Sequence, residues 1–168
     1  MQQPYVIRRA TEGDAEGIAQ LLHTVVSERV YSAIDRAWTA DEQQAYLRSL
    51  SDREAVHVAV ADSDLVVGCQ TLDLYSSVLR SMSHVAQLGT FILPSWRGQG
   101  VGQMLFHTTR HFALSAGYRK LVIQVRASNA PALSFYRRLG FVECGRLASQ
   151  VVIDGCDDDE IILEIFLV

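Results

Sequence analysis

The stretch from residue 83 to residue 127 constrains the fold more than any other part of the chain. It reads as an apolar strand that ends before Pro94, a glycine-rich loop, a helix that ends at Gly117, and a second apolar strand at 120–127. Two strands joined through a helix lie parallel in one sheet, and this crossover is almost always right-handed. The segment therefore predicts a β-α-β unit, with Val101, Leu105, Thr108 and Phe112 on the inner face of its helix.

Strands and helices are also expected on both sides of this unit. They are a strand at 5–10, a helix within 11–30, a helix from Ala40 to Leu50 with Thr39 as N-cap, strands at 55–62 and 65–75, a helix from Asn129 to Leu139, and two long strands between 141 and 168 joined at the Asp-Gly pair 154–155. The order is β-α-α-β-β-β-α-β-α-β-β, without a linker or a repeat. It predicts one mixed α/β (α+β) domain over residues 1–168, with a mostly antiparallel sheet of six or seven strands.

The composition excludes several classes of protein. Hydrophobic residues make up 49% and charged residues 20% of the 168, and the formal net charge is −4. These values are typical of a globular protein and argue against a nucleic-acid-binding domain. The first residues lack a signal-peptide pattern, and no apolar run reaches the roughly 20 residues that span a bilayer. We expect a cytoplasmic protein without a membrane partner, with its three cysteines reduced and no metal site.

The loop "RGQGVG" (97–102) lies where the strand ends and the helix begins. The first turn of a helix presents unpaired N–H groups, and glycines allow a phosphate to approach them closely. Arg97 would add a cation. The loop lacks the Lys-Ser/Thr of a nucleotide P-loop and does not fit G-x-G-x-x-G. A phosphate site is therefore predicted, and a flexible turn with a helix cap is the alternative.

Three motifs in order resemble the GCN5-related N-acetyltransferase (GNAT) family: "FILP", "RGQGVG" and "NAPALSFYRRLGF". The resemblance covers roughly residues 5 to 168. It implies a sheet splayed open between its fourth and fifth strands, about four flanking helices, and acetyl-CoA in the cleft. It also implies that the loop Arg97, Gly98, Gln99, Gly100, Val101 and Gly102 holds the pyrophosphate. Phe91, Ile92 and Leu93 would pair with the pantetheine amides as a neighbouring strand does.

Asn129 and Tyr136 are seven residues apart, so they share one face of the predicted helix two turns apart. In the family that the chain resembles, the matching Asn bonds the cofactor arm and the matching Tyr lies near the sulfur. Tyr136 is therefore the expected general acid for the leaving thiolate. The alternative is that Tyr136 is a core aromatic and Asn129 only a helix cap.

The expected general base is missing at its usual position. Many GNAT proteins carry a glutamate on the fourth strand, where this chain has Gln87. An amide is not basic, but Gln87 could hold a water molecule. His84, Glu143 and the acidic run 157–159 are the other candidates for the base.

The acceptor pocket of the fold that the resemblance implies is built by the first two helices, their connection and the last strands. Tyr31 and Trp38 lie in that connection and could shape the pocket or simply pack. The expected acceptor is a small-molecule or peptide amine, and a homodimer stays open. The expected function is direct acetyl transfer from acetyl-CoA to a primary amine, and a non-catalytic acyl-CoA-binding module is the alternative.

Overall fold

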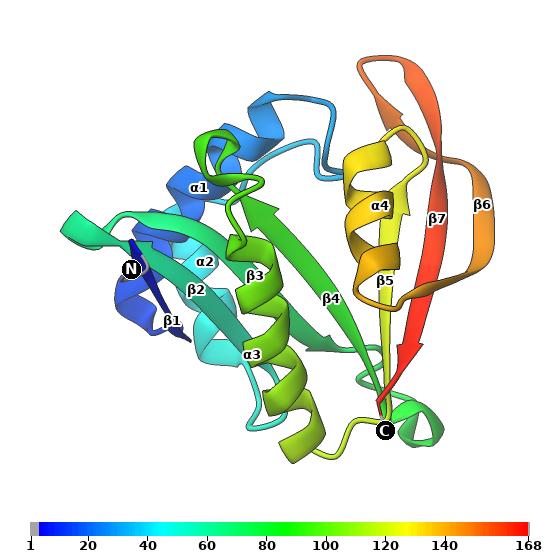
Figure 1. Ribbon diagram of the computed structural model, residues 1–168, viewed down its shortest axis with the longest axis horizontal. Helices are drawn as coiled ribbons and strands as arrows, with labels where there is room; N and C mark the ends of the chain where they lie inside the picture. The colour runs from blue at the N-terminus through cyan, green and yellow to red at the C-terminus, as the bar shows by residue number, and fades with distance from the viewer. Residues whose placement is uncertain (1–3, 168) are drawn as a thin grey trace.

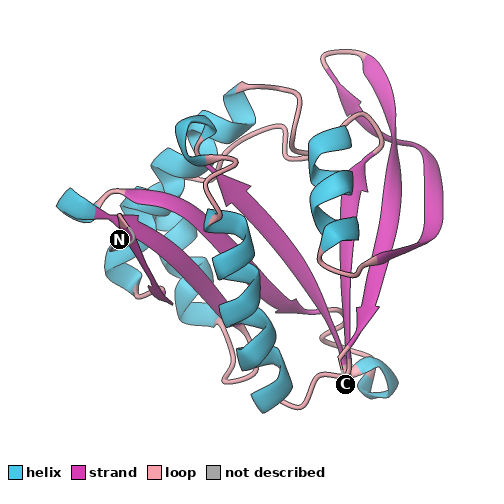
Figure 2. Cartoon of the chain, viewed as in Figure 1, coloured by secondary structure: helices cyan, strands magenta, loops and turns pink. Residues whose placement is uncertain are grey.

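The computed structural model describes residues 4–167, which form a seven-stranded sheet flanked by four α-helices (Figures 1 and 2). The strands are β1 (Tyr5–Arg9), β2 (Ala55–Ala61), β3 (Val66–Leu74), β4 (Val85–Ile92), β5 (Lys120–Arg126), β6 (Val142–Ile153) and β7 (Cys156–Phe166). The helices are α1 (Ala15–Ser27), α2 (Ala40–Ser49), α3 (Val101–Ser115) and α4 (Ala130–Arg138), with short 3-10 turns at Glu12–Asp14, Asp62–Asp64, Arg80–Met82 and Pro94–Trp96. The predicted order of elements is confirmed.

The sheet is open between its two central strands. Its strand order is β1-β2-β3-β4-β5-β7-β6, and every neighbouring pair except β4–β5 is antiparallel. β4 and β5 run parallel, but they pair only through residues 85–87 of β4 and 120–122 of β5. Beyond Gln87 the two strands diverge, as Figure 1 shows. The predicted splay between the fourth and fifth strands is confirmed.

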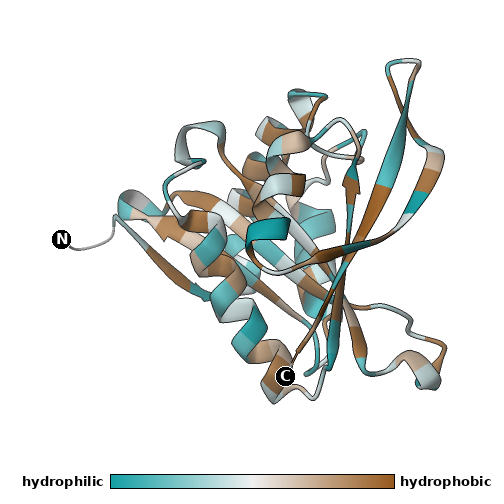
Figure 3. Ribbon diagram, turned by 45° about the vertical axis from the view of Figure 1, so that its right-hand side comes forward, coloured by the Kyte–Doolittle hydropathy of each residue, from teal (hydrophilic) through white to brown (hydrophobic). Residues whose placement is uncertain are grey.

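The helices cover both faces of the sheet. α1 and α2 pack on one face around Ile18, Leu21 and Val56, and α3 and α4 pack on the other around Phe106 and Tyr136. The brown segments of Figure 3 mark the apolar residues of the central strands between these layers.

The inner face of α3 differs from the prediction by one residue. Thr109, not Thr108, is fully buried, and it follows Val101 and Leu105 at four-residue intervals. A straight helix laid on a sheet buries such an i, i+4 row. Phe112 is only partly buried, at the edge of this row.

Candidate functional site

A cleft of about 850 Å³ lies where β4 and β5 separate. Its walls are the end of β4, the glycine loop and first turn of α3, and the inner face of α4. The residues that line it are Val25, Tyr31, Thr90, Phe91, Ile92, Trp96, Arg97, Gly98, Gly100, Gly102, Gln103, Asn129, Pro131, Ala132, Ser134, Phe135, Tyr136, Arg138 and Leu139. The structure thus brings most of the predicted cofactor-binding residues to one cavity.

The edge of β4 that faces this cleft carries backbone groups free of strand pairing. The Leu93 N–H donates to Val67 O on β3 at 2.9 Å. Because successive peptide groups of a strand point to opposite sides, Ile92 and Thr90 direct theirs toward the cleft. Leu93 was predicted to pair with a bound ligand, but its N–H is already used within the sheet. Ile92 and Thr90 are the residues that can pair there.

The three glycines of the loop are required for two different reasons. Gly98 (φ 73°) and Gly100 (φ 83°) adopt left-handed backbone, which side chains disfavour. Gly102 is helical, and a Cβ there would meet Ile92 Cδ1 at 3.0 Å and Phe135 Cζ at 3.1 Å. Only the first two glycines therefore shape the loop, and the third allows α3 to pack. The N-cap, Gly100, has no capping side chain, so the first N–H groups of α3 remain available to an anion.

Arg97 is not a free cation at the loop. Its guanidinium pairs with both carboxylate oxygens of Glu28, and its Nε donates to Ile92 O at 3.1 Å. It also lies over the ring of Tyr31, 4.6 Å from the centroid. The arginine thus fastens the end of α1 to the end of β4, and Glu28 offsets the positive charge that the sequence suggested for this loop.

Tyr136 lies at the inner wall of the cleft and is almost fully buried. Its hydroxyl donates to Thr90 Oγ1 at 2.7 Å, and Thr90 Oγ1 also accepts from Gln70 Nε2 at 2.8 Å. Burial raises the pKa of Tyr136, and the hydrogen bond to Thr90 opposes this effect only in part. The phenol is therefore protonated at neutral pH and can donate its proton.

Asn129 is a helix cap, which is the alternative that the sequence allows. Its side-chain oxygen accepts from Ala132 N, which makes it the N-cap of α4, and its amide donates to Tyr31 O at 3.1 Å. The residue also lines the cleft. It thus links α4 to the connection between α1 and α2.

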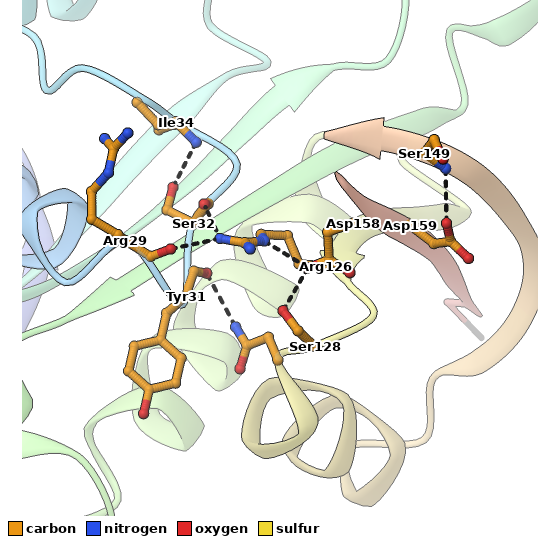
Figure 4. Close-up of polar contacts among 10 residues, drawn as sticks. Arg29, Tyr31, Ser32, Ile34, Arg126, Ser128, Ser149, Asp158 and Asp159 are labelled. Atoms are coloured by element: carbon orange, nitrogen blue, oxygen red, sulfur yellow. Dashed lines mark hydrogen bonds and ion pairs between the residues drawn. The ribbon is translucent and has the colours of Figure 1, made fainter. Parts of the chain in front are cut away.

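That connection (residues 28–38) spans the mouth of the splay. Arg126 on β5 donates to Arg29 O and Ser32 O and pairs with Asp158 on β7, as Figure 4 shows. Arg29 in turn pairs with Asp154 in the β6–β7 hairpin. These contacts bind the first half of the sheet to the second across the cleft.

A second cavity, of about 410 Å³, lies on the α1–α2 face of β3 and β4. Its lining is Ile18, Leu22, Ile34, Trp38, Gln43, Tyr46, Val56, Cys69, Thr71, Asp73, Gln87, Leu88, Gly89 and Phe91. Phe91 lines both cavities, so they adjoin each other along β4.

The model of the acetyltransferase (GNAT) family matches residues 24–141, which is more than half of the chain. The chain belongs to the GNAT family.

Individual proteins also resemble the chain. Streptothricin acetyltransferase of Streptomyces lavendulae is 41% identical over 54 residues (32% of this chain, 29% of the relative), and an uncharacterized N-acetyltransferase of Methanocaldococcus jannaschii is 26% identical over 145 (83% and 61%). Among solved structures, a GNAT superfamily phosphinothricin acetyltransferase from Sinorhizobium meliloti in complex with acetyl-CoA has a TM-score of 0.88 at 17% identity, over 98% of this chain and 89% of that one. The chain spans about 29 to 61% of the length of the first three curated relatives.

Three of the predicted residues outside the glycine loop and α4 line one of the two cavities of this GNAT fold, and His84 does not. Tyr31 lines the cleft, whereas Trp38 and Gln87 line the second cavity. His84 precedes β4 at the closed end of the splay, where its carbonyl accepts from Arg119 N, and it lines neither cavity.

The acidic candidates for the base lie elsewhere. Glu143 pairs with Arg137, Asp158 with Arg126 and Asp159 with Arg146, and neither cavity includes them or Asp157. Residues 4–167 hold no group of three or more His, Cys, Asp or Glu side chains that could bind a metal, and no helix among them is long and apolar enough to cross a bilayer.

Sequence reasoning missed Tyr46 and Asp73. Asp73 lies opposite Gln87 in the β3–β4 register, and the Tyr46 hydroxyl donates to its Oδ1 at 2.5 Å. Burial raises the pKa of Asp73, and its hydrogen bonds to Tyr46 and Thr71 only partly offset this. Asp73 is the one charged residue in the strand "VVGCQTLDL", and this was the signal that could have pointed to it.

Proposed function

We propose that the chain is an acetyl-CoA-dependent N-acetyltransferase that acts on a primary amine. The observation that carries the proposal is the cleft itself: it joins free helix N–H groups at one end, free β-strand edge along its wall, and a buried protonated phenol deeper inside. Membership of the GNAT family supports the same chemistry.

The groups along the cleft suit the chemistry of coenzyme A. The N–H groups of residues 98–102 would hold the pyrophosphate, because glycines at Gly98 and Gly100 leave open space around the backbone. The Ile92 N–H would pair with an amide carbonyl of the pantetheine arm as a strand does, while Ile92 O is held by Arg97. Bound in this way, the coenzyme supplies a thioester as the acetyl donor.

The chain's own groups would assist the transfer at three points. The Thr90 N–H, which faces the cleft beside Tyr136, would polarise the thioester carbonyl. The amine nitrogen attacks that carbonyl carbon, the C–N bond forms and the C–S bond breaks. Tyr136 gives its proton to the departing sulfur. The nitrogen of an ammonium substrate loses two protons in total. One restores the proton that Tyr136 gave to sulfur and the other is released, so the products are an amide, a thiol and one proton.

Proton removal from the amine is assigned to a water molecule held by Gln87. Gln87 lies at the point where β4 and β5 separate and lines the second cavity. Its amide can orient water by hydrogen bonds although it is not itself basic.

Thiol release tests the proposal. Purified protein with acetyl-CoA should release free thiol with at least one class of primary amine, and kcat/KM should rise with pH as the free amine becomes available. Calorimetry with acetyl-CoA alone provides the control for cofactor binding. Tight binding without thiol release above background for any amine would instead establish a non-catalytic acyl-CoA-binding module.

A further inference from the structure

We propose that the second cavity is the acceptor site and that it selects an apolar primary amine with a single positive charge, whose ammonium group faces Asp73. This inference rests on the proposed function and adds the class of substrate.

The position of the cavity along β4 matches the position where the acceptor must meet the thioester. From the open end of the splay inward, β4 presents Ile92, then Thr90 with Tyr136 against it, and then Gln87 at the apex. A coenzyme held by the loop at 97–102 would bring its sulfur toward Thr90 and Tyr136. Gly89 and Phe91, the two neighbours of Thr90 on β4, line the second cavity, so an amine that lies between them and Asp73 can reach a thioester beside Thr90. The second cavity opens on the opposite face over this same part of β4.

Among the residues that line the cavity, ionisable charge is restricted to one group, although the carboxylate of Glu54, outside the lining, adds negative charge near Asp73. Of the described residues that line it, Asp73 is the only carboxylic acid, and none is Lys, Arg or His. The Cys69 thiol stays neutral because burial raises its pKa to about 12. An amino acid would therefore leave its carboxylate without a cationic partner, and a diamine would leave its second ammonium without an anion. Burying an unpaired charge is costly, so both classes should bind poorly.

The rest of the lining suits an apolar body. Ile18, Leu22, Ile34 and Val56 form an aliphatic wall, and Trp38 packs edge-on against Tyr46, with 5.6 Å between ring centroids. A cavity of about 410 Å³ is of the size that holds a small ligand. An arylalkyl or alkyl amine would cover this wall and place its ammonium at the polar end.

Asp73 is held in position for such a contact. The Tyr46 hydroxyl occupies its Oδ1, and Thr71 on the same strand also bonds the carboxyl group. Opposite it in register is Gln87, the proposed holder of the water. An ammonium ion that faces Asp73 would favour the ionised carboxylate, which can then accept, through that water, the proton that the amine releases. The proton passes from nitrogen to carboxylate and on to solvent, so no other reactant is needed.

Matched pairs of amines test the selectivity. 2-Phenylethylamine and phenylalanine differ only by a carboxylate, and pentylamine and pentane-1,5-diamine differ only by a second ammonium. The monoamine of each pair should have a kcat/KM at least about 100-fold higher, since a site that leaves a charge unpaired discriminates strongly. Equal or reversed preference within the pairs would overturn the proposal and leave acetyl transfer itself intact.

Asp73→Asn tests the role of the carboxylate, because asparagine removes the negative charge but can still accept the Tyr46 hydrogen bond. We expect kcat/KM for 2-phenylethylamine to fall about 100-fold, within the usual range for a lost proton acceptor, while the affinity for acetyl-CoA is unchanged. Asp52→Asn, in the exposed turn before β2, removes the same charge and should have no effect. An active Asp73→Asn protein with wild-type kcat/KM would show that the carboxylate is not used.

Failure of the proposed function gives a different result. If no amine causes thiol release, calorimetry of protein saturated with acetyl-CoA still measures how the paired amines bind. Preference for the monoamines, lost in Asp73→Asn, would support the acceptor site without turnover. Absence of binding or of preference would overturn it.

Discussion

At the scale of single residues, the direction of the hydrogen bonds that link Gln70, Thr90 and Tyr136 decides whether Tyr136 can act as an acid. Gln70 donates to Thr90, and Tyr136 donates to the same oxygen. Thr90 therefore keeps its own proton as a donor. When the phenol turns its O–H toward sulfur, Thr90 can donate to the phenol oxygen and stabilise the negative charge that develops there.

Tyr136→Phe should lower kcat about 10- to 100-fold with little change in the KM for acetyl-CoA, because only the proton donor is removed. The measurement is thiol release at saturating amine. If kcat is unchanged while the chemical step limits the rate, Tyr136 serves only in packing.

Substitutions of Thr90 test whether its hydrogen bond to Tyr136 matters for catalysis. Thr90→Val should lower kcat less than Tyr136→Phe does, and Thr90→Ser should restore it. In the Tyr136→Phe background, Thr90→Val should have no further effect, because the two residues act as one unit. Additive losses would separate Thr90 from Tyr136.

His57 gives a prediction on stability rather than catalysis. It is buried against Phe112 and Thr109, and burial lowers its pKa to about 4. The unfolded state, with an ordinary pKa of about 6.5, binds more protons in acid, so stability is lost as the pH falls through this range. We expect the free energy of unfolding to drop by about 2 kcal/mol between about pH 7 and pH 5 on account of His57.

Urea unfolding at the two pH values measures this difference. His57→Gln should remove most of the pH dependence, and His111→Gln, on the exposed side of α3, should retain it. Equal slopes for the two variants would contradict the assignment.

At the scale of elements, the loop between β4 and α3 combines two requirements that are independent. Gly98 and Gly100 provide a left-handed turn that directs the N–H groups toward the cleft, and Gly102 lets α3 approach Phe135. Replacing a loop glycine would therefore disturb packing or backbone as well as binding. A change of charge without a change of backbone is the cleaner test.

Gln103→Glu makes that change in the first turn of α3, where Gln103 is exposed and lines the cleft. We expect acetyl-CoA to bind about 10-fold more weakly, because a carboxylate would repel the pyrophosphate at close range. His107→Glu places a carboxylate one turn farther along, outside the cleft lining, and should change affinity much less. Calorimetry compares the two, and equal affinities would place the pyrophosphate elsewhere.

At the scale of the whole molecule, the splay that makes the cleft also weakens the sheet. β4 and β5 share only residues 85–87 and 120–122, so the two halves need other contacts. The connection between α1 and α2 supplies them through Arg126 and Asn129. The contacts that stabilise the open sheet therefore also position Tyr31 and Arg97 at the cleft.

Arg126→Met should destabilise the protein by about 3 kcal/mol, because it removes the ion pair with Asp158 together with the hydrogen bonds to Arg29 O and Ser32 O. Arg146→Met breaks a more exposed pair with Asp159 and should cost less than about 1 kcal/mol. Denaturant unfolding gives both values. Similar losses in the two variants would show that the Arg126 contacts contribute no more than a surface ion pair.

Local patterns in the sequence determined the elements and their order. The alternation of apolar residues, the Asp-Gly hairpin, the Thr39 cap and the glycine at the end of α3 each act within a few residues, so they can be read without the fold. The parallel β-α-β unit followed in the same way from one strand, one helix and one strand. The family motifs added the splay and the residues of the cleft.

Only the tertiary structure decided which distant side chains meet. In the fold, Arg97 pairs with Glu28, which is 69 residues away in the sequence, and His84 lies outside both cavities. Asp73 lies opposite Gln87 and is hydrogen-bonded by Tyr46. These meetings depend on sheet register and on how the helices pack, which no local pattern specifies. The sequence by itself therefore determined that a GNAT-like cleft should form. Only the packing of β3, β4 and α2 decided that the carboxyl group of Asp73 lies in the second cavity, next to that cleft.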